Sequence, residues 1–358
     1  MPWGEWLLSA AFTAISFSIA LIACRFVMRI GIVDAPDGAR KMQTVAVPRL
    51  GGVAILIGTL FGGLISLCVL ALAYGIHPVD IFAILFRQIT GGEWKLSLML
   101  AFVGAAFLIG LWDDVFAANT KLKLLIMATA CFAIVAAGLK VTTLDTPWGG
   151  LNGQALLLVG SALWLLVFTN ASNFMDGANG LAIGSLAIMI ASLALTGVLA
   201  GDFIFSVWWF PVLGSVAGFL VQNLRGHLYA GDAGALALGA LFSGLGLMSG
   251  LQVWTVATIG LPFLLDVLLT LVWRAKHQRN WLDAHLDHAY QRLIASGWSH
   301  VETASLYWAM SATAGVLAYI GAKAGGAAPF LVFWTLTVAG SMIWVIHRRS
   351  AQRHDFAD

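Results

Sequence analysis

Long apolar runs recur along the whole chain, and short polar stretches separate them. Each run is close to the roughly 20 residues that a helix needs to cross the hydrocarbon core of a bilayer. We count eleven of them, at residues 5–24, 50–74, 97–112, 122–139, 154–169, 180–200, 206–222, 234–250, 253–273, 303–321 and 328–346. The pattern predicts an all-α, polytopic membrane protein with about eleven transmembrane helices, folded as a single multi-pass domain over residues 1–358.

The composition agrees with this assignment. Hydrophobic residues make up 60% of the chain and charged residues only 10%, with a mean hydropathy of +0.90, far above the range of soluble domains. The apolar stretch 234–273 could be one long segment, but Ser249-Gly250 predicts a turn inside it. Residues 253–273 are then expected to form one span.

The basic residues divide unevenly between the two sets of loops that eleven alternating spans produce. One set holds fifteen of the 19 Lys and Arg residues, and the other holds only Arg87, Lys95, Lys140 and Lys323. Cytoplasmic loops are the ones enriched in Lys and Arg. The split therefore predicts a periplasmic N-terminus, a cytoplasmic C-terminus, and cytoplasmic loops at 25–49, 113–121, 170–179, 223–233 and 274–302.

The rare polar side chains gather in those same five loops. A pair of carboxylates ends one apolar run, an Asn/Asp-rich segment repeats at intervals of three residues, and a His-rich segment follows the ninth run. Their members are Asp113 and Asp114; Asn170, Asn173, Asp176 and Asn179; Asp232 in "GDAGA"; and His285, Asp287 and His288. Residues three apart on a helix or tight turn share a face. We therefore expect these stretches, with residues 40–52, to open onto one membrane face.

Each stretch also has a simpler interpretation. An acid pair at a helix end can be solvated, and Asn or Asp can cap a helix. Two histidines three residues apart lack the third ligand of a zinc site, and Gly51-Gly52 can merely ease close helix packing. Their joint occurrence on one face of a chain with so few polar residues favours a functional site.

Two other protein classes fit the pattern less well. A secondary transporter is expected to place its polar residues near the bilayer midplane, between inverted repeats, and no such repeat is found in the sequence. The segment "DGAR" at 37–40 suggests a CDP-alcohol phosphotransferase, but residues 41–60 lack the further aspartates that such an enzyme needs.

The polar residue types point to phosphate chemistry. Carboxylates and amide oxygens without thiolates form a hard oxygen environment, which suits Mg²⁺ or Mn²⁺. Gly-flanked turns let backbone N–H groups approach phosphate oxygens, and Lys41, Arg49 and Arg225 are expected to neutralise their charge. The set predicts a phosphorylated, nucleotide-linked substrate from the cytoplasm and a second substrate borne by the lipid.

Five ordered motifs resemble those of the polyprenyl-phosphate N-acetylhexosamine-1-phosphate transferases of glycosyltransferase family 4. They are PRLGG (Pro48 to Gly52), GLWDD (Gly110 to Asp114), NASNFMDGANGLA (Asn170 to Ala182), GDAGAL (Gly231 to Leu236) and the His loop (His285 to Gln291). The resemblance covers nearly the whole chain. Among these enzymes, the His loop is most similar to that of the members that initiate O-antigen synthesis.

The resemblance implies a reaction and its location. A polyprenyl phosphate such as undecaprenyl phosphate attacks the β-phosphate of a UDP-N-acetylhexosamine, and the products are polyprenyl-pyrophosphoryl-HexNAc and UMP. The enzyme is expected in the bacterial inner membrane, with its site on the cytoplasmic face. It would initiate O-antigen or lipopolysaccharide synthesis, or, as the alternative, a peptidoglycan or teichoic-acid precursor. No nucleic-acid partner is expected, and a homodimer is left open.

The resemblance also assigns residue roles. Asp113 and Asp114 inherit the catalytic role, and Asn173 and Asp232 that of Mg²⁺ ligands, with Mn²⁺ as the other candidate metal. The expected substrate-binding residues are Lys41, Arg49, Asn170, Asp176, Asn179, Asn223, Tyr229, His285 and His288. The second phosphate pKa near 6 makes obligatory deprotonation of the lipid phosphate a weak demand, which favours direct attack over a phospho-enzyme.

The chain departs from the family pattern at three positions. Asn179 stands where many relatives have an aspartate, so it is better suited to contact the nucleotide than a metal. Gln43 stands where the family often has histidine, which removes support for a catalytic role there. The segment from His285 to His288 differs from the HxHH of some GlcNAc-type relatives, so a donor other than plain UDP-GlcNAc is expected.

Overall fold

The computed structural model describes residues 3–35, 45–73, 75, 77, 94–199, 206–280 and 285–354. Within these ranges the chain forms thirteen helices and two short antiparallel strand pairs. The helices are α1 (Trp3–Val27), α2 (Gly51–Ala73), α4 (Trp94–Phe116), α5 (Thr120–Ala136), α6 (Gln154–Phe174), α7 (Leu181–Leu199), α8 (Ser206–Asn223), α9 (Gly231–Met248), α10 (Val253–Ile259), α11 (Leu261–Lys276), α12 (Ala289–Ala295), α13 (His300–Ala324) and α14 (Ala328–His354).

The prediction of an all-α polytopic membrane protein is confirmed. Helices occupy each of the eleven apolar runs, and a turn at Ser249-Gly250 separates α9 from α10 as expected. Of the described helices, six are long and apolar enough to cross a membrane by themselves, or seven when the bent pair α10–α11 is taken as one span. The count of eleven spans and the orientation of the termini remain predictions.

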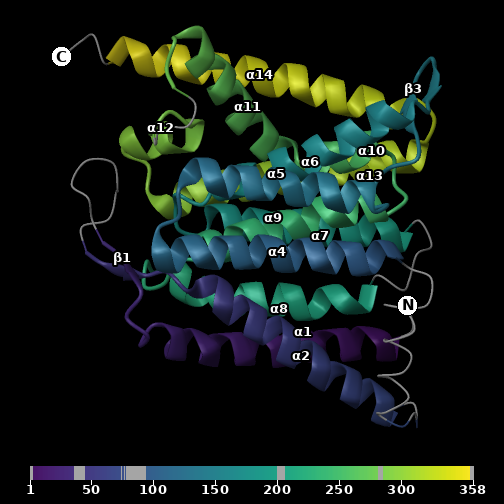
Figure 1. Ribbon diagram of the computed structural model, residues 1–358, viewed down its shortest axis with the longest axis vertical. Helices are drawn as coiled ribbons and strands as arrows, with labels where there is room; N and C mark the ends of the chain where they lie inside the picture. The colour runs from purple at the N-terminus through teal and green to yellow at the C-terminus, as the bar shows by residue number, and fades with distance from the viewer. Residues whose placement is uncertain are drawn as a thin grey trace.

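Residues 253–273, which are predicted as one span, form a bent pair of helices. The segment breaks between α10 and α11, whose axes differ in direction by 79°. Pro262 lies in the first turn of α11, where its missing N–H costs nothing but would have been needed to continue α10. Gly260 at the break contacts the ring of Phe168 so closely that a Cβ would collide with it. Figure 1 shows α11 turned away from the common direction of the bundle.

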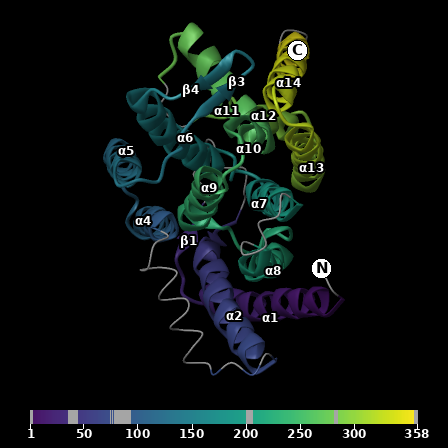
Figure 2. The ribbon, with the colours of Figure 1, turned by 90° about the vertical axis from the view of Figure 1, so that its right-hand side faces the viewer.

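Helix α9 is the centre of the bundle. It packs against α2, α4, α6, α7 and α10, and Figure 2 shows it surrounded by other helices when the bundle is seen nearly end-on. Glycines permit the closest approaches, since a Cβ at Gly52 or Gly110 would collide with the backbone of α9 at Gly234 or Ala233. The hydrophobic effect does not drive helices together inside a bilayer, so membrane helices depend on such close backbone packing.

The two ends of the bundle differ in character. One end carries the strand pair β1 (Val33–Asp34) with β2 (Val47–Pro48), the start of α9, the helix α12 and the end of α14. The other carries the start of α1 and the hairpin of β3 (Leu144–Thr146) with β4 (Gly149–Leu151). Figure 1 shows β1 and α12 at one side and β3 at the opposite side. The loops rich in polar residues therefore share one end, which we call the polar end.

The close contact at Gly110 gives a stability prediction with a control in the same helix. Gly110→Ala should lower the free energy of unfolding by about 1–3 kcal/mol, as overpacking does in well-packed interiors. Gly104 is exposed and has open space where its Cβ would lie, so Gly104→Ala should leave stability unchanged or slightly raised. Thermal unfolding of the two purified variants in detergent measures the difference. Equal melting temperatures would contradict the packing described for α4 and α9.

The predicted orientation can be tested with single cysteines at exposed positions of the two ends. Asn152 lies beside β4, and Ser296 follows α12 at the polar end. In intact cells of a variant lacking Cys24, Cys68 and Cys131, a membrane-impermeant maleimide should label Asn152→Cys but not Ser296→Cys. Permeabilised cells should label both. Labelling of Ser296→Cys alone in intact cells would reverse the orientation.

Candidate active site at the polar end of the bundle

Asp113 and Asp114 lie in the last turn of α4, directly beside the start of α9. Gly110, one turn earlier on α4, is in backbone contact with Asp232 and Ala233. This contact brings residues that are more than 110 positions apart in the sequence into one cluster. The two aspartates are consecutive on a helix and diverge by about 100°, so they reach different partners.

Asp114 has a structural role, because its side chain binds the backbone of α9. The residue is 3% exposed, and its two carboxylate oxygens accept hydrogen bonds from the backbone N–H groups of Asp232 and Ala233, each at 3.0 Å. These groups belong to the first turn of α9, where backbone donors have no partner within the helix. Gly231 precedes them with φ at +71°, and a Cβ there would contact the Asp114 carboxylate. Asp114 therefore connects α4 to α9.

Arg49 donates hydrogen bonds to backbone carbonyls in the last turn of α4. Its Nε donates to the carbonyl of Asp114 at 3.0 Å, and its Nη2 donates to the carbonyl of Asp113 at 2.9 Å. The guanidinium also forms an ion pair with Asp34 of β1 at 3.6 Å. Sequence reasoning expected Arg49 to bind substrate, but in the structure its donors satisfy the last carbonyls of α4, where a cation is favoured.

Asp113 faces a different group of side chains. Lys123 Nζ, from the first turn of α5, lies 3.1 Å from Asp113 Oδ2 and also forms an ion pair with Asp232 Oδ2. Asn173 Nδ2, from the last turn of α6, donates to the same Asp232 oxygen at 3.1 Å. The side chains of Asp113, Lys123 and Asp232 are 19%, 16% and 23% exposed, so this cluster remains accessible. We call Asp113, Lys123, Asn173 and Asp232 the carboxylate cluster.

Lys123 is the member of this cluster that sequence reasoning missed. In the sequence it is one of the fifteen basic residues of the predicted cytoplasmic side, and no motif assigns it a role. A signal was present, because Lys123 stands at the beginning of an apolar run, two residues after Lys121. A lysine placed inside a predicted membrane helix is costly unless it is paired, and this makes it a functional candidate.

The loop between α6 and α7 lies beside the carboxylate cluster. Burial and the nearby carboxylates of Asp232 and Asp114 raise the pKa of Asp176 well above its ordinary value. Asn223 is 3% exposed and joins two loops, since its Oδ1 accepts from the backbone of Gly180 at 2.6 Å and its Nδ2 donates to the carbonyl of Leu228 at 2.9 Å. Asn223 thus holds the shape of this region.

Three further residues predicted to bind substrate, Tyr229, Asn179 and Asn170, each have different neighbours in the structure. Burial, followed by the charges of Asp34 and Asp176, raises the pKa of Tyr229, which places its phenol near both loops. The backbone N–H of Asn179 donates to His300 Nδ1 at 3.2 Å. Asn170 donates to the carbonyl of Leu166, one turn earlier in α6, so its amide is engaged within its own helix. Lys41 lies outside the described residues.

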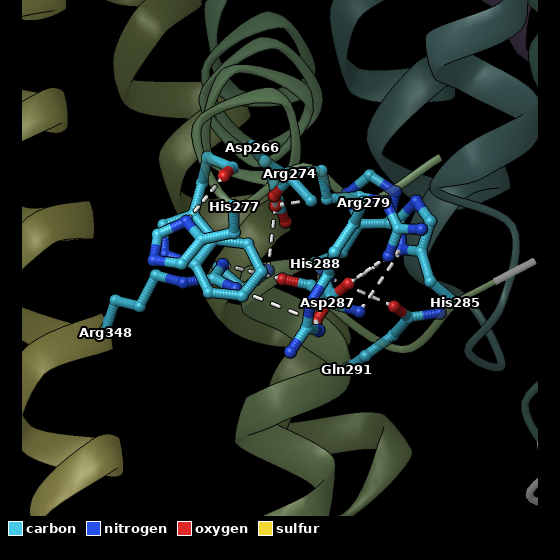
Figure 3. A network of polar contacts seen from close by, with 12 residues as sticks. Asp266, Arg274, His277, Arg279, His285, Asp287, His288, Gln291 and Arg348 are labelled. Atoms are coloured by element: carbon cyan, nitrogen blue, oxygen red, sulfur yellow. Dashed lines mark hydrogen bonds and ion pairs between the residues drawn. The ribbon is translucent and has the colours of Figure 1, made fainter. Parts of the chain in front are cut away.

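The His-rich segment is held by a buried carboxylate of α11. Asp266 accepts hydrogen bonds from the backbone N–H of Ala289 at 2.8 Å and from the hydroxyl of Tyr307 at 2.6 Å. His288 precedes α12 and is only 3% exposed, with its Nδ1 3.4 Å from Asp266 Oδ1. Figure 3 shows Asp266, His288 and Asp287 as parts of one polar network. His288 is therefore an interior residue, and the more accessible His285 lies beside it, with ring centroids 5.0 Å apart.

Tyr290 connects the His-rich segment to the loop that carries Asp176. Its hydroxyl donates to the carbonyl of Phe174 at 3.0 Å and lies against Gly177, where a Cβ would collide with it.

His285 has a lowered pKa. Burial is the main reason why the pKa of His285 falls to about 4, and the charges of His288 and Arg274 lower it further. His285 is consequently neutral at pH 7 and can both donate and accept a hydrogen bond.

Comparison with known proteins gives this arrangement a family. Residues 96–250 match glycosyl transferase family 4, and this segment contains α4 through α9 with the whole carboxylate cluster. Residues 96–250, which are less than half of the chain, thus resemble a glycosyl transferase family 4 domain. It is 29% identical over 293 residues to a Bacillus subtilis (strain 168) protein named probable undecaprenyl-phosphate N-acetylglucosaminyl 1-phosphate transferase, covering 79% of this chain and 75% of the relative.

Two further relatives are named for the transfer of different groups, one of them N-acetylglucosamine phosphate again. A decaprenyl-phosphate N-acetylglucosaminephosphotransferase of Mycolicibacterium smegmatis is 29% identical over 303 residues, which are 76% of this chain and 71% of the relative. A phospho-N-acetylmuramoyl-pentapeptide-transferase of Phenylobacterium zucineum is 29% identical over 301 residues, which are 75% of this chain and 77% of the relative. The resemblance stated from the sequence motifs is confirmed at the level of the family.

The residues of the carboxylate cluster suit a hard cation by their chemistry. Two carboxylates and an amide oxygen are ligands that Mg²⁺ accepts, together with substrate phosphates. Among the described residues, however, no group of three or more His, Cys, Asp or Glu side chains is arranged to hold a metal. The Lys123 ammonium lies between Asp113 and Asp232, so positive charge is already favoured at this position.

The division of labour between the two aspartates predicts different stability effects. In Asp114→Asn one of the two backbone N–H groups of α9 faces an NH₂ group, and a buried donor without a partner costs about 1–3 kcal/mol. Asp113→Asn touches no backbone group of α9 and should change stability by no more than about 0.5 kcal/mol. Thermal unfolding in detergent compares the two purified variants. A loss of stability in Asp113→Asn that equals the loss in Asp114→Asn would contradict the assignment.

Proposed function

We propose that this protein transfers HexNAc-1-phosphate from a UDP-N-acetylhexosamine to a polyprenyl phosphate in the bilayer. An oxygen of the lipid phosphate attacks the β-phosphorus of the donor, the bond from this phosphorus to the bridging oxygen breaks, and UMP leaves with that oxygen. The product is a polyprenyl-pyrophosphoryl-HexNAc. We place the reaction on the cytoplasmic face of the bacterial inner membrane, with residues 1–358 acting as one catalytic unit.

The carboxylate cluster is the observation that carries this proposal. Asp113, Lys123, Asn173 and Asp232 come from four helices and meet at the polar end of a multi-pass bundle, within reach of solvent. A lipid phosphate is at this depth because its headgroup lies at the membrane surface, while a nucleotide sugar arrives from water. A site at the end of the spans can receive both substrates, whereas the alternative, a secondary transporter, binds its substrate near the midplane.

Asp113 and Lys123 have complementary tasks in this proposal. The Lys123 ammonium attracts the phosphate groups and lowers the repulsion between two anionic substrates. Asp113 positions the attacking phosphate, a role that suits it because Asp114 is engaged with the backbone of α9. At neutral pH most of the lipid phosphate has lost its second proton, since that pKa is near 6. Direct attack therefore requires positioning more than proton removal.

Asn173 and Asp232 would hold the Mg²⁺, with Mn²⁺ as a substitute. When bound, the cation supplies charge neutralisation at the pyrophosphate as UMP departs. Lys123 would then release one or both carboxylates and turn toward phosphate, since its long side chain allows several positions.

The donor is expected to lie between the α6–α7 loop and the His-rich segment. Asp176, which its surroundings hold in the protonated form more readily than an ordinary aspartate, can donate a hydrogen bond to the nucleotide. Asn179 and Tyr229 lie nearby, and neutral His285 is suited to hydroxyl and acetamido groups of the sugar. Asn223 and His288 would support these contacts from the interior.

For the pathway, we propose the initiation of a lipid-linked envelope polysaccharide such as O-antigen. Its support is the His285 to Gln291 sequence, which resembles that of O-antigen-initiating enzymes. Initiation of peptidoglycan or teichoic-acid precursors uses the same chemistry, and two of the relatives are named for N-acetylglucosamine donors. The identity of the donor decides between these pathways.

A donor panel tests the proposal directly. Purified protein is mixed with undecaprenyl phosphate, Mg²⁺ and radiolabelled UDP-GlcNAc, UDP-GalNAc or UDP-MurNAc-pentapeptide. Label should move into the lipid fraction with one UMP released per lipid product, for a UDP-HexNAc and not for the pentapeptide donor, and EDTA should stop the reaction. Protein in vesicles that accumulates the donor unchanged would instead identify a transporter.

Substitutions in the carboxylate cluster should remove turnover without unfolding the protein. Asp113→Asn and Asp232→Asn should each reduce kcat by roughly 10² or more, the usual cost of losing one electrostatic contact to a transition state. A rise in Mg²⁺ should restore part of the rate in Asp232→Asn. Asp145→Asn, at an exposed aspartate of β3 at the other end of the bundle, serves as the control and should keep full turnover. Near-normal kcat in both cluster variants would refute the site.

A further inference from the structure

The last helix of the described chain reaches back to the His-rich segment through one arginine. Arg348, near the end of α14, is 4% exposed although it lies beyond the apolar part of that helix. Its Nη1 donates to the backbone carbonyl of Asp287 at 2.9 Å, and its Nη2 is 3.7 Å from Asp287 Oδ1. The contact joins two segments that are 61 positions apart.

Asp287 is the common partner of several guanidinium groups. Arg274 of α11 forms an ion pair with Asp287 Oδ2, and Arg279 donates to Oδ1 at 3.3 Å. These bonds, with the Arg274 bond first, hold the pKa of Asp287 below its ordinary value although burial acts in the opposite direction. The carboxylate thus remains charged and paired even without Arg348.

Arg348 is held mainly by aromatic rings. Its guanidinium carbon lies 3.6 Å from the ring centroid of Trp273 and 4.9 Å from that of Trp344. Its Nε and Nη2 are buried and make no hydrogen bond within the described part of the chain. Burial and the charge of Arg292 lower its pKa to about 10, so it is charged at pH 7. The cation is therefore held by the rings of Trp273 and Trp344 and by the backbone carbonyl of Asp287.

This geometry gives Arg348 a place behind the proposed donor site. In Figure 3 Arg348 and His285 lie on opposite sides of Asp287. On the side of His285, the backbone N–H of Asp287 donates to His285 Nδ1 at 3.3 Å. One residue thus receives the arginine at its carbonyl and orients the histidine with its N–H.

We propose that Arg348 is a positioning residue, which fixes the backbone at Asp287 and thereby sets the orientation of His285 toward the sugar of the donor. The effect on donor binding rests on the proposed function. The structural half of the inference, that Arg348 fixes the backbone at Asp287, does not. Because Arg274 and Arg279 still neutralise Asp287 when Arg348 is removed, the variant is expected to fold. The loss should affect binding of the donor, not of the lipid phosphate.

Steady-state kinetics separate this role from general structural damage. Arg348→Ala should raise the KM for the UDP-sugar by about fivefold to twentyfold, the loss expected when a misoriented His285 no longer makes one hydrogen bond to the sugar. The KM for polyprenyl phosphate and the kcat should stay within about twofold, because uniform binding energy is removed. Arg29→Ala, at an exposed arginine after α1, controls for the loss of one positive charge.

Two further variants test the stacking contact. Arg348→Lys keeps the charge but not the planar group that lies on Trp273, so it should give an intermediate rise in the donor KM. Trp273→Leu removes the ring, which also faces the guanidinium of Arg279 at 4.9 Å, and should raise the donor KM in the same direction. The double variant Arg348→Ala/Trp273→Leu should raise the donor KM by less than the product of the two single effects, since both changes break the contact between Arg348 and Trp273.

Hydrogen exchange tests the structural half without any activity. Backbone amides in a peptide covering residues 285–295 should exchange faster in Arg348→Ala than in the wild type, while the hairpin of β3 and β4 exchanges equally. Unchanged exchange there together with an unchanged donor KM would overturn the inference. So would an equal rise of both KM values with a lower melting temperature. An inactive wild type would refute the proposed function alone, and the exchange result would still decide the positioning role.

Discussion

The two hydrogen bonds from the start of α9 to the Asp114 carboxylate are the contact on which the site depends. A helix that begins in the interior leaves backbone N–H groups without partners, and a carboxylate is the strongest acceptor available for them. The bonds can form only because Gly110 and Gly231 let the backbones of α4 and α9 approach closely. Once Asp114 is bound in this way, the helical geometry directs Asp113 to another side, where Lys123 and Asp232 lie.

This arrangement brings several carboxylates close together, and neighbouring residues reduce the repulsion between them in several ways. Lys123 is placed between Asp113 and Asp232, and Arg49 binds beside Asp114. Asp176 lies deeper, where burial and its acidic neighbours favour the protonated form. A cluster of this kind has a strong preference for added positive charge. It is therefore suited to phosphate chemistry that is assisted by a divalent cation.

The break at Gly260 has a comparable effect on the other half of the site. A straight span would have carried Asp266 and Arg274 along the bundle axis, whereas the 79° bend directs α11 across it. Asp266 can then bind the first amides of α12, and Arg274 can bind Asp287. The His-rich segment is thus supported by α11, α13 and α14 together, and Tyr290 connects it to the loop beside the carboxylate cluster.

The sequence alone determined the class of the protein, since apolar runs of membrane-spanning length and the rarity of charge leave few alternatives. It also supplied Asp113, Asn173 and Asp232 through their motifs, and a predicted common face for them. The break at Gly260 escaped prediction because residues 253–273 are apolar throughout, and hydropathy does not report direction. Only the tertiary structure assigned Asp114 to the backbone of α9 and Arg49 to that of α4. It also brought in Lys123 and Arg348, because partners 61 to 119 positions apart depend on how helices pack and not on the local sequence pattern.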